Sequence, residues 1–310
     1  MKIALFIPYF GKLPSYMPLF LKFFKINFID IFFISDLDFS ELEIPENVHI
    51  IKVSFDELKE RIHKVTGLIV NWTKPYKLCD LKPLYGLLFQ NILQSKGYDY
   101  WAFGDCDLIY GNCLESKLVS ILKDDYDIIS FRKLWVTGSL CILKNAERVN
   151  RLFIDNCPEI KEVVQNDKNY AADECGLVHK QLLSGCLLNE IDNEITSFTE
   201  IIINCSIKWY HEDIIQDIIA NDEIITVEGN NIISSKNNNP IFILHFVCNK
   251  YDPLFKFPNW KTIPYKFNID KYGFYTKSTI IRSYYKLYRR FHKFLIMTYS
   301  KFRNKFYIMI

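Results

Sequence analysis

The 310-residue sequence lacks several features that would assign it quickly to a class. None of its nine cysteines forms a C-x-x-C pair, so a zinc ribbon or a thioredoxin-type site has almost no support. No internal repeat and no Pro-, Gly- or Ser-rich linker divides the chain. An odd, scattered set of cysteines is typical of reduced, mostly buried thiols in a cytosolic protein.

Signals for secretion and for a membrane-spanning helix are also missing. The apolar run at the N-terminus is interrupted by Pro8, and no small-residue cleavage site follows it. The apolar stretch 19–34 contains Lys22, Lys25 and Asp30, which break it too often for a spanning helix. We therefore expect a cytoplasmic protein that contacts a membrane only from its surface.

Acidic residues are absent from the end of the chain. Residues 277–310 contain nine basic side chains, which leaves 29 basic against 36 acidic residues in 1–276, a net charge of about −7. A nucleic-acid-binding domain would spread positive charge over a folded face, so we expect no nucleic-acid partner. The sequence predicts one catalytic domain over 1–276 and a basic aromatic tail over 277–310.

Short apolar runs alternate with helical stretches, and the apolar share of 49% excludes an intrinsically disordered chain. This alternation predicts an α/β fold with a mostly parallel central sheet and ligands at the carboxyl ends of its strands. The predicted strands are 2–7, 29–34, 48–53, 98–103, 127–132, 140–143 and 241–246, with a β-like pattern over 196–209. The predicted helices are 14–25, 80–94, 114–122, 147–153 and 174–183, and 229–239 is predicted as a loop.

The most informative segment is the turn that contains Asp105 and Asp107, directly after the predicted strand 98–103. Buried carboxylates are costly to desolvate, and a divalent cation can compensate them. Hard oxygen ligands favour Mg²⁺ or Mn²⁺, which share their coordination with substrate phosphates. The alternative is a solvated turn in which one carboxylate caps the next helix.

With four other segments, this turn resembles bacterial GT-A glycosyltransferases of surface-polysaccharide and lipopolysaccharide biosynthesis. The matching segments are IPYFGK (7–12), FISD (33–36), YKLCDLKPLYG (76–86), WAFGDCDLIYG (101–111) and LHFVCNK (244–250). The resemblance implies a Rossmann-like GT-A sheet and a nucleotide-sugar donor, with a UDP-sugar favoured. It also implies Mn²⁺ or Mg²⁺ held by Asp105 and Asp107, with Asp105 close to the donor.

The resemblance implies donor contacts in the loops after the first two strands. Pro8, Tyr9, Gly11 and Lys12 follow the first strand, where the glycine allows close backbone approach and Lys12 can meet a phosphate. Asp36 ends the second strand, where base or ribose contact is implied. The alternatives are a plain surface turn for Lys12 and a helix or turn cap for Asp36.

Two further segments carry charged candidates. Lys77, Asp80 and Lys82 are expected to form a cradle for the donor pyrophosphate or sugar, and the alternative is an exposed ion pair of little energetic worth. In GT-A enzymes a late histidine completes the metal shell and a following lysine faces the diphosphate, which are the roles implied for His245 and Lys250. A strand histidine satisfied within the core is the alternative.

Asp173 and Glu174 are the candidate catalytic residues. One of these carboxylates would face the acceptor hydroxyl, as general base in an inverting enzyme or as a positioning group in a retaining one. The alternative is that they favour the dipole at the start of the predicted helix 174–183. Gly138 would let the donor sugar approach the backbone, or would form a plain turn.

The tail mixes aromatic residues with basic ones at helical spacing, leaving an aromatic and apolar face. A basic amphipathic helix of this kind suits an anionic membrane surface, where the enzyme would meet a lipid-linked glycan acceptor. The alternatives are a terminal helix packed on the core and a weak RNA-binding tail.

The sequence thus predicts a hexosyltransferase, peripheral at the inner face of the cell membrane. It would transfer a sugar to a hydroxyl of a lipopolysaccharide, capsular or other surface glycan. A metal-dependent phosphatase of the D-x-D type is disfavoured, because it would carry D-x-D-x-[TV] on the first strand, whereas Leu108-Ile109 follow this motif. A non-catalytic membrane adaptor is the third possibility.

Overall fold

The computed structural model describes residues 1–276 together with 283–284, 287–288, 290–292 and 294–295. Contacts between residues divide the chain into two units. Unit 1 comprises Met1–Ile109 and Leu114–Ile215, and unit 2 comprises Tyr110–Cys113 and residues 216–310. The predicted amphipathic helix of the tail falls largely outside the described residues, and the boundary at 276/277 stays a prediction.

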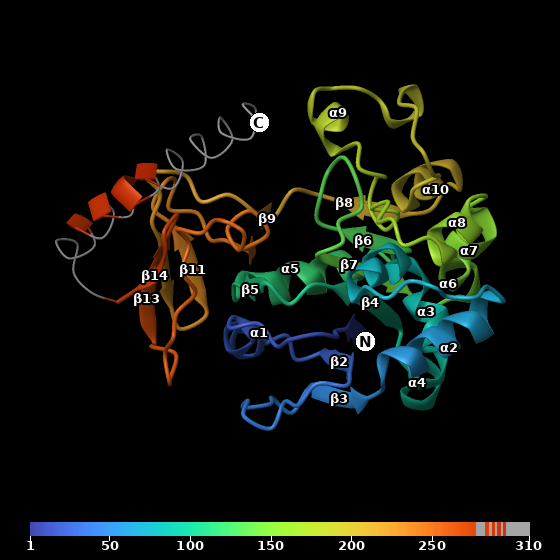
Figure 1. The fold of residues 1–310 in the computed structure, drawn as a ribbon, viewed down its shortest axis with the longest axis horizontal. Coiled ribbons are helices and arrows are strands. Elements are labelled where there is room, and N and C mark those ends of the chain that lie inside the picture. The colour runs from blue at the N-terminus through green and yellow to red at the C-terminus, as the bar shows by residue number, and fades with distance from the viewer. Residues whose placement is uncertain (277–282, 285–286, 289, 293, 296–310) are drawn as a thin grey trace, which may run out of the picture. The chain divides into compact units, whose positions relative to one another are not determined.

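Unit 1 contains a seven-stranded sheet of order β3-β2-β1-β4-β7-β6-β8 (Figure 1). Within this sheet β7 runs antiparallel to its neighbours β4 and β6, and the remaining pairs are parallel. The strands are β1 Ile3–Pro8, β2 Ile29–Ser35, β3 Val48–Lys52, β4 Tyr100–Gly104, β6 Ile128–Ser130, β7 Leu140–Lys144 and β8 Trp209–His211. The predicted α/β fold with a mostly parallel central sheet is therefore confirmed.

Helices flank this sheet and bury their apolar faces in one large core that includes Phe6, Trp101 and Phe103. A capping box between Ser54 and Glu57 begins the helix Phe55–Thr66, as its sequence pattern favours. The α-helices are α1 Met17–Phe23, α2 Phe55–Thr66, α3 Tyr85–Leu88, α4 Gln90–Lys96, α5 Cys113–Leu122, α6 Glu147–Asn150, α7 Leu152–Asn156, α8 Ile160–Gln165, α9 His179–Leu183 and α10 Phe198–Asn204. Residues 1–276 also contain the 3₁₀ helices η1 Pro75–Leu84 and η2 Leu188–Glu190.

Unit 2 contains an antiparallel sheet of order β11-β10-β13-β14. Its strands are β10 Ile225–Glu228, β11 Asn231–Ser234, β13 Lys266–Asp270 and β14 Gly273–Tyr275. A cluster of aromatic rings that includes Phe246, Phe255 and Phe274 packs within this unit. A small third sheet joins β5 Leu108–Tyr110, β12 Ile243–His245 and β9 Ile215–Gln216 in the order β5-β12-β9.

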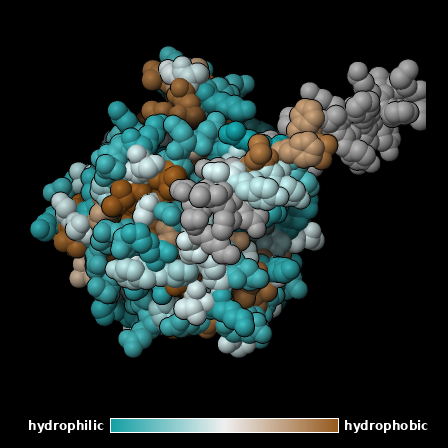
Figure 2. Space-filling model, turned by 90° about the vertical axis from the view of Figure 1, so that its left-hand side faces the viewer, coloured by the Kyte–Doolittle hydropathy of each residue, from teal (hydrophilic) through white to brown (hydrophobic). Residues whose placement is uncertain are grey.

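No helix among the described residues is long and apolar enough to cross a bilayer. On the face of the molecule drawn in Figure 2, hydrophilic residues predominate and the hydrophobic ones form small separate groups.

Two predictions were wrong, one of a strand and one of a loop. The segment 196–209 is β-like in sequence but contains the helix α10, because the Ser197 side chain accepts a bond from the Glu200 amide and caps it. Ile201 is buried and Ile203 is exposed, as one face of a helix requires. The predicted loop 229–239 contains β11, which pairs with β10 in a hairpin.

Two predicted helices are shorter than expected. The range 80–94 is split, since η1 runs to Leu84 before two short α-helices, and Pro83 has no N–H to donate. In the range 174–183 only α9 is helical, because Gly176 and Leu177 have φ angles of 73° and 64°, left-handed conformations that interrupt a helix.

A buried ion pair anchors the segment that leads to the candidate catalytic residues. The Lys77 ammonium lies 2.7 Å from the Asp80 carboxylate, and both side chains are almost completely buried. Lys77 also donates to the carbonyl of Lys168, while Asp80 accepts bonds from the amides of Tyr170 and Ala172. Burial lowers the pKa of Lys77, and the charge of Asp80 opposes that shift. The pair therefore fixes residues 168–172 against η1.

The first prediction concerns this pair. Replacing Asp80 with asparagine would leave the buried Lys77 ammonium without its counter-charge, which typically costs about 3–5 kcal/mol. We expect Asp80→Asn to lower the free energy of unfolding by about that amount in urea denaturation. The matched control is Asp155→Asn, which breaks the exposed pair with Arg151 and should have no measurable effect. Equal stability of the two variants would contradict the anchoring role.

Candidate functional site

The D-x-D motif occupies the connection between β4 and β5. The Asp105 amide donates to the carbonyl of Ser139 at 3.0 Å, which ties the turn to the residue before β7. A side chain at Gly104 would place its Cβ 2.9 Å from the same carbonyl, so glycine is needed there. The Asp105 side chain is 33% exposed, whereas Asp107 is buried. The turn thus offers one accessible and one buried carboxylate.

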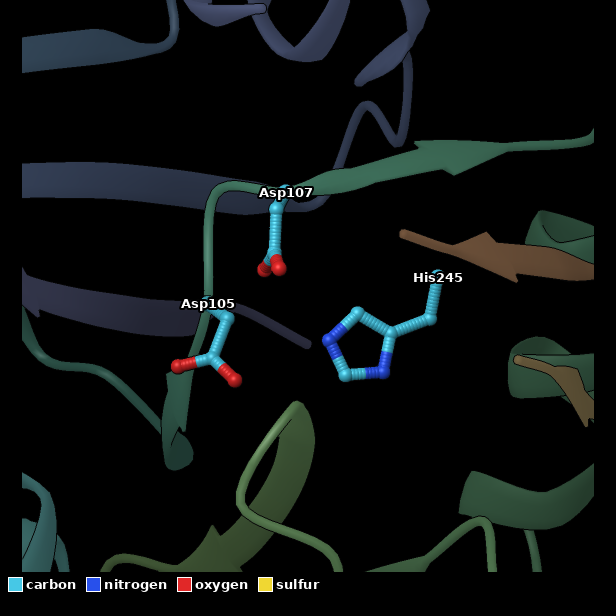
Figure 3. A group of neighbouring side chains, drawn as sticks. All are labelled: Asp105, Asp107 and His245. Atoms are coloured by element: carbon cyan, nitrogen blue, oxygen red, sulfur yellow. The ribbon is translucent and has the colours of Figure 1, made fainter. Parts of the chain in front are cut away.

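Asp105, Asp107 and His245 form a group that could hold a metal ion, with one ligand atom from each lying within 4.8 Å of the others. Figure 3 shows the three side chains turned toward one another. His245 ends β12, and its Nδ1 lies 3.1 Å from the Asp217 carboxylate. Metal-binding histidines commonly have a carboxylate partner on the other ring nitrogen. Two carboxylates and an imidazole are ligand types that suit Mn²⁺ or Mg²⁺, so these residues could hold the predicted ion, whose identity stays a prediction.

Tyr16 belongs to the same surroundings, although no sequence motif indicated it. It is the N-cap residue of α1, beyond the loop that follows β1. Burial raises the pKa of its phenol strongly, and the charges that Cys106, Asp107, Tyr9 and Asp105 can carry raise it further. The phenol therefore stays protonated and faces the acidic turn as a neutral hydroxyl.

Lys82 links the acidic turn to the next two segments of the site. Its ammonium donates to Asp105 Oδ1 and to the carbonyl of Gly138, each at 2.8 Å, and lies 3.6 Å from Asp173 Oδ2. Burial alone would lower the pKa of Lys82, but the charges of Asp105, Cys79 and Asp173 and the bond to Asp105 raise it well above the ordinary value. Lys82 is therefore a permanent buried cation.

Gly138 lies where these charged groups crowd together. A Cβ at this position would come within 2.6 Å of Asp173 Oδ2 and 3.1 Å of the Lys82 ammonium. Its carbonyl and its amide are both used, by Lys82 and Glu174 respectively. A side chain at this position would therefore displace the charged groups around it, a constraint that a plain surface turn would not impose.

Asp173 and Glu174 do not begin a helix, so the helix-dipole alternative for them is wrong. They lie in a turn, and α9 begins at His179. Glu174 accepts a bond from the Gly138 amide at 2.6 Å through one oxygen and lies 2.8 Å from His179 Nε2 through the other. The ring of Trp135 meets the His179 ring edge to face, with centroids 5.1 Å apart. The Glu174 carboxylate is therefore held on both sides.

The environment of Asp173 favours the protonated acid. Burial raises its pKa well above the ordinary value, and the nearby charges of Glu174, Asp80 and Asp105 add to the shift, while Lys82 opposes it. A carboxyl group in this position retains its proton at a higher pH than an exposed one.

The environment of Glu174 favours the ionised form. Burial would raise its pKa, but the bond and charge of His179, the Gly138 amide and the Lys82 charge together lower it. Two adjacent carboxyl groups are thus shifted in opposite directions, a pattern typical of sites that transfer protons.

A family model, "Family of unknown function (DUF6625)", matches residues 5–308. The chain belongs to this family. A search of curated proteins found no match.

The two loops predicted to bind the donor lie at neighbouring strand ends in the DUF6625 chain. The Tyr9 amide donates to the carbonyl of Ile34, and the Ser35 hydroxyl donates to the carbonyl of Tyr9. Pro8 and Tyr9 are half-buried, and the side chain of Asp36 at the end of β2 is exposed. Farther along the first loop, Lys12 is exposed and Gly11 has a φ of 111°, which favours glycine.

The remaining predicted residues lie in different settings. Lys77 and Asp80 are buried against each other, so they form neither an open cradle nor an exposed ion pair. Lys250 is half-buried in unit 2, with its ammonium 5.2 Å from the centroid of the Tyr251 ring. The structure brings together Lys82, Asp105, Gly138, Asp173 and Glu174, and adds His179 and Tyr16, which the sequence did not indicate.

The second prediction tests the opposite pKa shifts. The native state holds the Asp173 proton more tightly than the unfolded state, so ionisation of Asp173 reduces stability as pH rises above its ordinary pKa of 3.8. Asparagine cannot ionise, so Asp173→Asn avoids this loss of stability. We expect the variant to be at least as stable as the wild type at pH 7. Glu174 has a lowered pKa, so its contribution is present at neutral pH and is lost as pH falls below its ordinary pKa of 4.5.

Glu174→Gln should therefore be less stable than the wild type at pH 7, with the difference shrinking toward pH 3. Thermal unfolding of both variants across pH 3–8 provides the measurement. Loss of stability at pH 7 in Asp173→Asn equal to that in Glu174→Gln would show that the two groups are not shifted in opposite directions.

Proposed function

We propose that this protein is a metal-dependent glycosyltransferase of the GT-A type. It transfers a sugar from a nucleotide-diphosphate sugar to a hydroxyl of a surface glycan, as the resemblance of its motifs implies. The observation that carries the proposal is the Lys82 ammonium, which lies between the D-x-D residue Asp105 and Asp173, the neighbour of the candidate base Glu174, within unit 1. A metal-binding motif and a fixed, ionised carboxylate are the two parts that such a transfer needs.

The donor nucleotide would bind at the carboxyl ends of β1 and β2, where ligands bind in parallel α/β sheets. The loops after these strands meet through the bond between Ser35 and Tyr9. Asp36 is exposed and can accept bonds from ribose or base, and the exposed Lys12 can approach a phosphate. These features support a nucleotide site, while the preference for a UDP-sugar rests on the resemblance alone.

The diphosphate would lie against the acidic turn. Asp105, Asp107 and His245 would hold Mn²⁺ or Mg²⁺, which when bound stabilises the negative charge of a departing diphosphate. Lys82 orients Asp105 and adds a fixed positive charge to the turn. Lys250 of unit 2 is a further candidate for phosphate contact.

Glu174 would act as the base toward the acceptor. Its side chain is 25% exposed, and His179 and the Gly138 amide fix its orientation. As the acceptor oxygen bonds to the anomeric carbon, Glu174 takes the hydroxyl proton and the bond from that carbon to the diphosphate oxygen breaks. The electron pair leaves with the diphosphate. Asp173 is buried beside Lys82 and keeps its own proton, so Glu174 is the carboxylate that can meet the acceptor.

The third prediction separates donor binding from chemistry. Isothermal titration with UDP, GDP and CMP, each with and without Mn²⁺, should identify one nucleotide whose binding requires the metal. Asp107→Asn should weaken that binding at least about tenfold, because it removes a buried ligand of the proposed ion. Glu174→Gln should keep nucleotide binding while lowering the transfer rate by about 10²–10⁴-fold.

Asp155→Asn serves as control for both measurements, since this carboxylate is paired at the surface with Arg151. Full transfer activity in the presence of EDTA would refute the metal-dependent reaction. If no nucleotide binds and the protein has phosphatase activity, the D-x-D phosphatase is favoured. If no nucleotide binds and neither transfer nor phosphatase activity is found, the non-catalytic membrane adaptor is favoured.

We also propose that residues 277–310 attach the enzyme to the inner face of the cell membrane, where a lipid-linked glycan would be available. The proposal is supported by composition, since this segment has nine basic residues, no acidic ones and many aromatics. Each basic residue close to an anionic surface contributes about 1 kcal/mol of attraction.

The fourth prediction follows from this charge. Truncation after Tyr275 should abolish sedimentation with vesicles that contain anionic lipid, and the wild-type interaction should weaken as salt is raised. Arg290→Gln, which removes one charge and keeps the remaining eight, should retain most of the binding. Undiminished vesicle binding by the truncated protein would exclude the tail as the membrane contact.

A further inference from the structure

Unit 2 contains a cavity of about 360 Å³ that no step of the proposed reaction uses. Three segments line it: the chain after β9, the chain after β12, and the turn between β13 and β14, with Arg290 completing the wall. Its volume lies in the range of small-molecule sites, about 300–1,000 Å³. The cavity is therefore large enough for one small ligand.

Two cationic side chains, Lys271 and Arg290, line the cavity. Lys271 donates to the side-chain oxygen of Asn221, and Arg290 donates through Nε to the Tyr272 hydroxyl at 3.2 Å. Among the described residues, neither cation forms an ion pair. Their charges act together on Tyr272, since burial raises the pKa of its phenol but the Arg290 bond and the Lys271 charge outweigh it and lower the pKa. The cavity wall thus carries two positive charges.

A buried amide adds a second, independent feature. Asn249 lines the cavity and is only 8% exposed, and its side-chain oxygen has no hydrogen-bond partner within the described part of the chain. A buried acceptor left in this state costs about 1–3 kcal/mol, so native proteins rarely keep one without a reason. A ligand hydroxyl would satisfy it.

The single acidic residue in the lining, Asp252, narrows the choice of ligand. One of its oxygens accepts a bond from the Leu254 amide, so the carboxylate is fixed in the loop. It repels a bare anion but accepts bonds from hydroxyl groups. The lining therefore offers two cations for one anionic group and two acceptors for neighbouring hydroxyls.

We infer that this cavity binds an anionic sugar, that is, a hydroxyl-bearing ring with one phosphate or carboxylate group. Lys271 and Arg290 take the anionic group, and Asn249 and Asp252 accept bonds from the hydroxyls. The inference uses residues of unit 2 alone and does not depend on the proposed glycosyl transfer. The ligand could come from two sources, a free sugar phosphate or an acidic residue of a glycan chain.

The fifth prediction tests this site on the full-length protein by isothermal titration without added metal. The probes are glucose 6-phosphate, digalacturonate, glucose and inorganic phosphate. We expect one of the two anionic sugars to bind at least tenfold more tightly than glucose or phosphate. The tighter of the two identifies the source, sugar phosphate or acidic glycan.

Variants locate the binding. Lys271→Gln and Arg290→Gln should each weaken it at least tenfold, while Lys261→Gln, an exposed lysine outside the cavity lining, should not change it. Asn249→Ala should weaken binding without lowering the melting temperature, because it removes a side-chain oxygen that has no partner among the residues that the structure describes. A purely structural asparagine would instead lower the melting temperature.

Three results would overturn the inference. The first is equal affinity for glucose and for both anionic sugars, or no binding of either anionic sugar. The second is unchanged affinity in both Lys271→Gln and Arg290→Gln. The third is complete displacement of the probe by UDP with Mn²⁺, which would assign the probe to the proposed donor site. Failure of nucleotide binding, by contrast, would affect only the proposed transfer.

Discussion

The buried ammonium group of Lys82 is the contact on which the candidate site depends. It reaches the D-x-D turn through Asp105, the loop before β7 through the Gly138 carbonyl, and the turn before α9 through Asp173. These groups come from separate parts of the chain, and all of them present oxygen atoms to the same ammonium group. A buried charge of this kind is stable only when its partners surround it, which makes the arrangement cooperative.

The same cation explains how two neighbouring carboxyl groups differ. Asp173 is enclosed and shares Lys82 with Asp105, so desolvation dominates and its proton is retained. Glu174 lies closer to the surface and receives bonds from His179 and the Gly138 amide, so its charged form is favoured. Position relative to one lysine and one histidine, rather than residue type, decides which group can accept a proton.

Much of the sheet could be predicted because its strands are uniformly apolar and are ended by residues such as Pro8 and Gly104. The D-x-D pair could be predicted for the same local reason. The helix α10 could not be predicted, because its consecutive isoleucines favour a strand, whereas the cap that Ser197 provides stabilises a helix. His179 gave no sequence signal, because its contact with Trp135 arises from folding. Lys77 was expected to be accessible, and only the packing of η1 reveals its burial.

The bonds that the amides of Tyr170 and Ala172 donate to Asp80 join parts of the chain separated by 90 and 92 residues. A contact across that distance closes a long loop, and its entropy cost must be met before the contact contributes. Residues 168–174 have little regular structure of their own, so they can reach their final arrangement only after η1 has formed on the sheet. The candidate catalytic carboxyl groups should therefore be among the last parts of unit 1 to become ordered during folding.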